Sequence, residues 1–233
     1  MRPIQTKKEV ERNSKLLRKC KKLFVERLLQ WYESEKRVFS WRNQILTPYQ
    51  VLILEIMLQR TPAERVDKLF TKFLKKYPNP LILSKVSDKT LESDLQTLGL
   101  QMRRRKLLKE LAARLIDKHN GQVPMSEEEL LQLPGVGMYV ANAILCYSRG
   151  KSVPLVDTNV ARVLRRVYGL RISGDPSSDE HLWAFAKSML PKTEVGEFNW
   201  ALIDFGALVC RPKAPLCEAC PMSDICLRKR LAY

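Results

Sequence analysis

The segment from Val51 to Leu58, VLILEIML, sets seven apolar residues around one carboxylate, Glu55. A helix with this composition has no polar face, so it is stable only where other elements cover it on every side. Elsewhere apolar residues recur mostly at three- and four-residue spacing, and the chain has no internal repeat or low-complexity segment. These patterns predict an all-α protein in which one helix is buried on every face and carries a carboxylate.

The charge balance predicts a polyanionic partner. Lys and Arg number 41 against 25 Asp and Glu, which gives a formal charge of +16. Aromatic residues make up only 8% of the chain, so a duplex held by its phosphates is favoured over a single strand held by stacking. A solvated charged surface, as in many heat-stable proteins, is the alternative. The basic residues are densest at 18–22, 103–106 and 165–166.

Membrane and secreted locations are not expected. The first ten residues, MRPIQTKKEV, contain no apolar stretch typical of a signal peptide, and no uncharged run reaches the roughly 18 residues that a membrane helix needs. With 233 residues and 45% hydrophobic content, the chain is long enough for one large core or two small ones. We expect a cytoplasmic, nucleoid-associated monomer, or a nuclear one in a eukaryote, with no membrane partner.

A tight turn between two predicted helices is a candidate phosphate-binding element. Ser126 and Glu129 match a capping box that opens a short helix, and a second helix runs from Met138 to about Arg149, before a C-cap glycine at 150. Residues 126–149 thus form a helix-hairpin-helix pattern, in which glycines let backbone N–H groups approach a phosphate. A plain connector is the alternative, because two glycines and a proline suit any tight turn. The residues expected at the phosphate are Leu133, Gly135, Val136 and Gly137.

Asp157 stands at the N-cap position of a predicted helix, TNVARVLRRVYGL, after an extended stretch from 151 to 156. A helix N-terminus favours an ionised carboxylate, whereas apolar surroundings raise the pKa of a carboxyl group by desolvation. If Asp157 and Glu55 share a pocket, their opposed environments suit an acid and base pair. The alternatives are a purely capping role for Asp157 and, for Glu55, a buried ion pair with Arg60 or Arg65.

Four cysteines near the C-terminus have the spacing C-x6-C-x2-C-x5-C. In a chain without a secretion signal, clustered cysteines are metal ligands before they are disulfides. Zinc ribbons usually have two C-x-x-C pairs, and only one occurs here, with His119 and His181 far along the chain. A [4Fe-4S] cluster is favoured and a zinc-containing regulator is the alternative, while Cys20 and Cys146 are expected in apolar cores. The expected ligands are Cys210, Cys217, Cys220 and Cys226.

LPGVGMYVANAIL, VDTNVARVL and the cysteine spacing together resemble the helix-hairpin-helix DNA glycosylase superfamily. The resemblance runs from about Trp31 to Cys226 and is to the iron–sulfur branch, which contains endonuclease III, the MutY adenine glycosylases and the Mig thymine mismatch glycosylases. It implies a six-helix barrel domain at 42–151 and a second helical domain, 1–41 plus 152–233, that carries the cluster. Double-stranded DNA would bind in the cleft between them, with the target base flipped out of the duplex.

The resemblance also implies roles for individual residues. SWRNQILTPYQVLILEIMLQRT is similar to the segment that supplies the catalytic glutamate in MutY and Mig enzymes, so Glu55 is expected to protonate the departing base. Asp157 would stabilise the sugar cation, and Asn159 would support that site. Tyr139 stands where endonuclease III has its Schiff-base lysine, which implies hydrolysis without strand cleavage. Simple packing is the alternative for Tyr139.

The C-terminal end of the sequence distinguishes the MutY branch from the Mig branch. MutY enzymes usually continue into a domain that reads 8-oxoguanine, whereas this chain ends seven residues after Cys226, so a Mig-like enzyme removing thymine or uracil opposite guanine is expected. The alternatives are a MutY-like adenine glycosylase without that domain and, from another class, a catalytically inactive iron–sulfur DNA-binding protein. Relatives insert side chains into the gap and touch the unpaired partner base at positions that correspond to Gln59, Arg60, Leu100 and Gln101, for which plain surface and loop residues are the alternative. The cluster is expected to fix the loop from Arg211 to Leu216, so that Arg211 and Lys213 lie against DNA phosphates.

Overall fold

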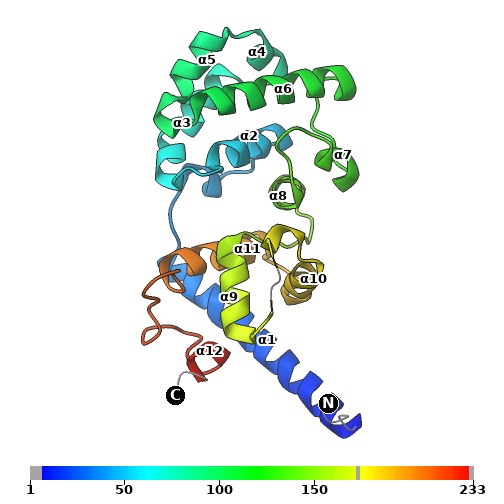
Figure 1. The fold of residues 1–233 in the computed structure, drawn as a ribbon, viewed down its shortest axis with the longest axis vertical. Coiled ribbons are helices and arrows are strands. Elements are labelled where there is room, and N and C mark those ends of the chain that lie inside the picture. Colours follow the sequence, from blue (N-terminus) through cyan, green and yellow to red (C-terminus); the bar gives the residue numbers. More distant parts are fainter. Residues whose placement is uncertain (1–6, 172–173, 231–233) are drawn as a thin grey trace. The chain divides into compact units, whose positions relative to one another are not determined.

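A computed structural model describes residues 7–171 and 174–230 (Figure 1). Within these residues all regular structure is helical, which confirms the predicted all-α class. None of the helices in this part of the chain has the length and apolarity needed to cross a membrane. The helices are α1 (Lys7–Glu35), η1 (Ser40–Asn43), α2 (Pro48–Leu58), α3 (Ala63–Lys76), α4 (Pro80–Lys85), α5 (Asp88–Leu95), η2 (Gln96–Leu98), α6 (Gln101–His119), α7 (Glu127–Leu131), α8 (Met138–Arg149), α9 (Thr158–Tyr168), η3 (Pro176–Ser178), α10 (Glu180–Met189), α11 (Val195–Leu208) and α12 (Leu227–Arg230).

The chain divides into two compact units. Unit 1 comprises residues 1–37 and 154–233, and unit 2 comprises residues 38–153. The domain limits expected from the sequence, 42–151 and 1–41 with 152–233, stay a prediction, because compactness does not show that either part folds alone. The parts of those expected domains at 1–6, 172–173 and 231–233 lie outside the described residues.

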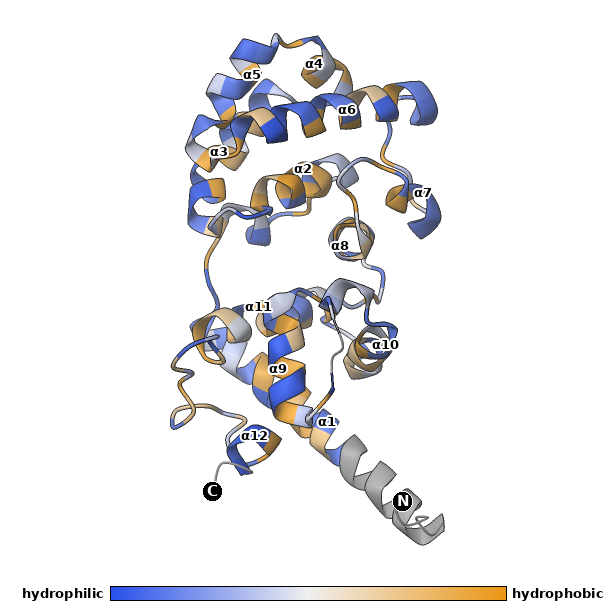
Figure 2. Cartoon of the chain, viewed as in Figure 1, coloured by the Kyte–Doolittle hydropathy of each residue, from blue (hydrophilic) through white to orange (hydrophobic). Residues whose placement is uncertain are grey.

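Unit 2 is built around α2. The helix begins at a capping box, in which the Thr47 hydroxyl accepts from the Gln50 N–H and the Gln50 side chain accepts from the Thr47 N–H. Its residues from 51 to 57 are all buried, and it packs against α3 and α8. Figure 2 shows α2 as mainly hydrophobic, whereas α6, which packs on α4 and α5, alternates hydrophobic and hydrophilic residues. The prediction of a helix buried on every face, with Glu55 inside it, is confirmed.

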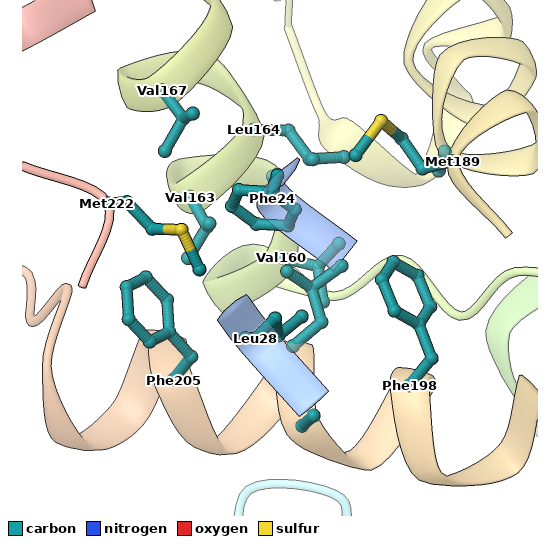
Figure 3. Close-up of a cluster of buried hydrophobic side chains, with 14 of the residues drawn as sticks. Phe24, Leu28, Val160, Val163, Leu164, Val167, Met189, Phe198, Phe205 and Met222 are labelled. Carbon is teal, nitrogen blue, oxygen red and sulfur yellow. The ribbon is translucent and has the colours of Figure 1, made fainter. Parts of the chain in front are cut away.

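Unit 1 has a separate core around α9. This helix is strongly amphipathic and packs on α11 and α12, while α1 packs on α11 (Figure 1). Phe24 and Leu28 of α1 meet Val160 and Leu164 of α9 and Phe205 of α11 in one cluster of fully buried side chains (Figure 3). Burying side chains of this size contributes about 1.5–3 kcal/mol each, so this cluster determines how α9 and the residues before it are held.

A buried ion pair lies just after the C-terminal end of α1. The Asp204 side chain on α11 is fully buried and accepts two hydrogen bonds from Arg37, from its N–H at 3.0 Å and its Nε at 2.7 Å. The Arg37 Nη2 forms an ion pair with the same carboxylate at 2.7 Å. A buried carboxylate without its cationic partner costs about 3–5 kcal/mol, so this pairing specifies where the chain leaves α1.

Candidate active site

Glu55 lies within a group of interacting side chains in unit 2. Its side chain, in the middle of α2, is 6% exposed. The α8 helix carries Tyr139 and Tyr147, and the phenol oxygen of Tyr147 is buried. Burial raises the pKa of Tyr147 well above its ordinary value, and charge at Tyr139, Cys146 and Glu55 raises it further, whereas Arg42 lowers it. Charges at Tyr139, Glu55 and Arg42 thus all act on Tyr147, and the α2 and α8 helices that carry Glu55 and the two tyrosines pack on each other.

Arg60 and Arg65 are not the partners of Glu55. Both are exposed, and among the described residues neither forms an ion pair with this carboxylate. Arg42, from η1, is the basic residue whose charge acts in the same environment. The Glu55 carboxyl group therefore lies in the middle of a helix whose neighbouring residues are apolar and buried.

Asp157 is the N-cap of α9, as predicted. Its Oδ1 accepts from the Val160 N–H at 2.7 Å, and its Oδ2 accepts from the Asn159 Nδ2 at 2.8 Å. The carboxylate is partly buried and stands at the positive end of the helix dipole. Each oxygen keeps a lone pair for a further contact, so capping does not use up its capacity to face a positive charge.

Asn159 links Asp157 to the cysteine-rich segment within unit 1. The Asn159 Oδ1 accepts from the Arg162 Nη2 at 2.7 Å, and the same nitrogen donates to the Gly206 carbonyl oxygen at 2.7 Å. The Arg162 Nε donates to the Cys210 carbonyl oxygen at 2.8 Å. A Cβ atom on Gly206 would lie 2.7 Å from the Asn159 Cβ, so only glycine lets α11 pack this closely on α9. Burial lowers the pKa of Arg162 from its ordinary value.

The four C-terminal cysteines line one cavity of about 320 Å³, and none of them is in a disulfide. Burial raises the pKa of the Cys220 thiol to about 11, and the other three thiols raise it further while the Met222 N–H lowers it. Donors already face two of the sulfurs, since the Met222 N–H lies 3.4 Å from the Cys220 Sγ and the Arg166 Nη1 lies 3.4 Å from the Cys210 Sγ. Among the described residues, no group of three or more His, Cys, Asp or Glu side chains is arranged to hold a metal ion.

Arg166 holds the start of the loop between the first two of these cysteines. Its Nη1 donates to the Arg211 carbonyl oxygen at 2.7 Å, and its Nη2 donates to that of Pro212 at 3.1 Å. The Arg211 side chain is partly buried and donates to the carbonyl oxygen of Ala214, a left-handed residue, whereas Lys213 is exposed. Lys213 is therefore the more accessible of the two predicted phosphate contacts in this loop.

The predicted helix-hairpin-helix consists of α7, the turn at 133–137 and α8. The Ser126 hydroxyl accepts from the Glu129 N–H, but the Glu129 carboxylate accepts from that hydroxyl rather than from the Ser126 N–H, so the capping box is incomplete. Gly135 has a positive φ of 76°, and a Cβ there would lie 2.8 Å from Leu107. Gly137, the N-cap of α8, is extended, and a Cβ there would have no neighbour within 4 Å. Position 135 of the turn therefore requires glycine, whereas position 137 has room for a larger side chain.

The remaining residues that were predicted to contact DNA differ in how exposed they are. Leu133 and Val136 are buried, so their side chains are not accessible to a duplex. Gln59 and Arg60 are exposed, and Leu100 is 49% exposed at the N-cap of α6, where Gln101 is the first helical residue. A small pocket is lined by Gln59, Arg60, Leu100, Arg103, Arg104 and Leu107.

Several residues around these groups were not found from the sequence. Tyr147 lies eight residues after Tyr139, two helical turns along the same face, and that spacing alone could have associated them. Arg162 comes three residues after Asn159, which also places the two on one face. Arg42 and Gly206 give no such signal, because their partners lie in other helices.

The chain matches known proteins over most of its length. Residues 53–187 match the family described as HhH-GPD superfamily base excision DNA repair protein. Thymine/uracil-DNA glycosylase of Methanothermobacter thermautotrophicus is 36% identical over 208 residues, which cover 89% of this chain and 94% of the relative. Adenine DNA glycosylase of Mycobacterium tuberculosis is 38% identical over 209 residues, which cover 88% of this chain and 67% of the relative. The solved structure of a thermostable thymine-DNA glycosylase superposes with a TM-score of 0.87 at 35% identity, covering 92% of this chain and 99% of that one.

The helical fold, the hairpin and these similarities define a base-excision DNA glycosylase. The chain belongs to the HhH-GPD superfamily of DNA repair proteins. The predicted family, enzyme class and helix-hairpin-helix are thereby confirmed.

The two hairpin glycines are expected to respond oppositely to substitution. Gly137→Asp should raise the free energy of unfolding by about 0.3 kcal/mol, because aspartate is a better N-cap than glycine. It should weaken binding to every duplex by about tenfold, or about 1.4 kcal/mol, because a negative charge would face the phosphate. Gly135→Ala should instead lower the free energy of unfolding by about 1–3 kcal/mol, because of its positive φ and the contact with Leu107.

Thermal melts and fluorescence anisotropy with matched and mismatched duplexes measure both effects. Loss of affinity for mismatched duplexes alone in Gly137→Asp would place the hairpin in base recognition instead of phosphate binding.

Proposed function

We propose that this glycosylase removes thymine or uracil opposite guanine by hydrolysis and leaves an abasic site in an intact strand. The observation that carries the proposal is Glu55, a carboxyl group buried in an apolar helix that packs on α8, the helix of Tyr139. The choice of base rests on the similarity to thymine/uracil-DNA and thymine-DNA glycosylases over nearly their whole length.

In this proposal Glu55 supplies the proton that the base takes up as the N-glycosidic bond breaks. This role rests on its place in the middle of the buried α2 helix, which packs on α8. Asp157 then faces the sugar cation through the lone pairs that capping leaves unused, and Asn159 fixes the orientation of that carboxylate. Water then adds its oxygen to C1′ and releases a proton, which replaces the one that Glu55 gave to the base.

Tyr139 determines how the reaction ends once the base has been released. A phenol forms no imine with the sugar, so the reaction stops at the abasic site without β-elimination. The chain therefore acts as a monofunctional glycosylase in this proposal.

The cofactor of this proposal is a [4Fe-4S] cluster held by Cys210, Cys217, Cys220 and Cys226. All four thiols line one cavity, and two sulfurs already accept hydrogen bonds of the kind that stabilise cluster thiolates. When bound, the cluster would fix the loop from 211 to 216, which offers Lys213 to a DNA phosphate. Unit 2 would serve as the hairpin domain and unit 1 as the cluster domain.

Removal of adenine is the second candidate. The 38% identity to an adenine DNA glycosylase favours it, and Glu55 and Asp157 would serve that reaction equally well. The two candidates therefore differ in the bases that they select and share the same proton donor.

A panel of four duplexes tests the substrate directly. Duplexes with T·G, U·G, A·G and A·8-oxoguanine pairs are incubated with the protein, and alkali then cuts any abasic site. We expect strand cuts after alkali for T·G and U·G, because these pairs carry the proposed bases. In the same assay Asp157→Asn and Glu55→Gln should each slow base release by about 100-fold or more.

Both variants keep the local structure, because asparagine also caps a helix and glutamine has the volume of glutamate. Their binding to T·G duplex should therefore stay close to that of the unmodified protein. Strand cuts confined to the adenine duplexes would select removal of adenine instead. Normal turnover by Asp157→Asn would mean that Asp157 only caps its helix.

The Tyr139→Lys variant tests the monofunctional assignment. A lysine at this position would present an amine whose pKa is lowered by the same partly buried surroundings, so that it attacks C1′. We expect borohydride to trap a covalent complex with Tyr139→Lys, which should also nick the strand without alkali. The unmodified protein should do neither, and strong trapping by it would mean that another amine reaches the sugar.

Metal analysis tests the cofactor. Protein purified without oxygen from native expression should be brown and contain about four iron atoms per chain, and Cys217→Ser should lose most of this iron. Cys20→Ser is the matched control, because Cys20 lies outside the cavity, and it should retain the iron. Stoichiometric zinc instead of iron would contradict the proposed cluster.

A further inference from the structure

A buried arginine of unit 2 has no role in the proposed chemistry. Arg104, in the first turn of α6, is 4% exposed, and burial lowers its pKa. Among the described residues it forms no ion pair with a carboxylate. Its Nη2 donates instead to the Gln59 carbonyl oxygen at 3.1 Å and to the Thr61 Oγ1 at 2.6 Å. A guanidinium that is removed from water in this way must compensate for its desolvation with these neutral acceptors.

The acceptors of Arg104 belong to a network that joins three segments. The Thr61 hydroxyl lies 3.2 Å from the Leu98 carbonyl oxygen, to which it donates. The Gln59 Nε2 donates to the Gly135 carbonyl oxygen at 3.1 Å. Arg104 therefore connects the turn at 59–61 to the loop at 98–100, and through Gln59 to the hairpin at 133–137.

Each of the first two segments contains a strained residue. Arg60 has a φ of 55° and Leu100 has a φ of 51°, and neither is glycine. A left-handed conformation costs a non-glycine residue about 1–3 kcal/mol and persists only where surrounding contacts impose it. Arg104 supplies contacts on both sides of Arg60, at Gln59 and Thr61, and its own N–H donates to the Leu100 carbonyl oxygen at 2.9 Å.

The two strained residues border one pocket of about 50 Å³, which Arg104 also lines. Because Leu100 is 49% exposed and Arg60 is exposed, both side chains are accessible to a ligand on this surface. They are also two of the side chains that we expect to enter an opened duplex.

We propose that Arg104 is a positioning residue for duplex opening, which holds the 59–61 turn and the 98–100 loop in the arrangement that lets Arg60 and Leu100 enter the duplex together. This inference rests on the proposed function, because it assumes that the target base must leave a paired duplex. Because Arg104 is 4% exposed and has no part in the proposed chemistry, its effect should depend on whether the duplex is already open.

The test compares a T·G pair in a continuous duplex with the same pair inside a three-pair bubble. With Arg104→Met, single-turnover base release should fall about tenfold or more for the continuous duplex but less than about threefold for the bubble, because misplaced loops matter only where stacking must be broken. Fluorescence of 2-aminopurine next to the target should also rise less on binding, and this readout does not require base release. Equal losses on both substrates, or no loss, would overturn the proposal.

Two further variants separate positioning from charge and stability. Arg114→Met removes the same charge from the exposed face of α6 and should show no substrate-dependent loss. Arg104→Lys should recover part of the activity on the continuous duplex, because an ammonium group reaches one of the two acceptors.

If Arg104→Met does not fold, Thr61→Val is used in its place. It keeps the side-chain volume, removes the shared hydroxyl, and should give the same selective loss on the continuous duplex. A uniform change, or none, in folded Thr61→Val would overturn the proposal. If the unmodified protein releases no base from any duplex, the proposed function fails, and the 2-aminopurine comparison alone then decides the role of Arg104.

Discussion

The burial of α2 on every face is the constraint on which the rest of unit 2 depends. A helix without a polar side must be covered, and α3 and α8 pack against it. Ile56 of α2 and Leu107 of α6 stand at 3.1 Å and 2.8 Å from the position of a Cβ on Gly135, so the hairpin turn lies against this core. The same packing puts Tyr139 and Tyr147 of α8 in the environment of Glu55. One apolar helix thus sets both the surroundings of the proton donor and the path of the hairpin.

The carboxylates of Glu55 and Asp157 have different surroundings because they occupy different positions in their helices. Glu55 sits in mid-helix, where backbone N–H groups are already used by the helix and apolar neighbours exclude water. Asp157 stands before a helix, where the Val160 N–H and the Asn159 amide are available to it. Capping and a catalytic role are compatible for Asp157, because the cap aims the carboxylate and leaves lone pairs unused. The confirmed N-cap is therefore a condition for the proposed role and no argument against it.

The sequence predicted those features that depend on neighbours in the chain. The helices at 138–149 and 158–168, the caps at Asp157 and Gly150, and the burial of Glu55 are confirmed, because propensity, capping and apolar spacing are local signals. The arginine contacts were not predicted. Arg104 donates to residues 43 and 45 positions away, and Arg162 to one 48 positions away, and nothing in their own surroundings in the sequence selects these partners. The glycine at 206 was missed for the same reason, because its need for a small side chain comes from α9.

Arginines that donate to neutral acceptors explain how a chain with a charge of +16 fixes its loops without losing that charge. An arginine paired with a carboxylate orders two segments but cancels its own field, as Arg37 does with Asp204. Arg162 and Arg166 donate mainly to backbone carbonyl oxygens, and Arg104 donates to one carbonyl oxygen and one hydroxyl oxygen. These neutral acceptors order a segment without cancelling the positive charge. The segments ordered in this way, the turn at 59–61 and the start of the cysteine loop, are the ones that we expect at the DNA. Carbonyl pairing therefore serves two requirements that an ion pair could not meet together, a fixed backbone and a surface that still attracts phosphate.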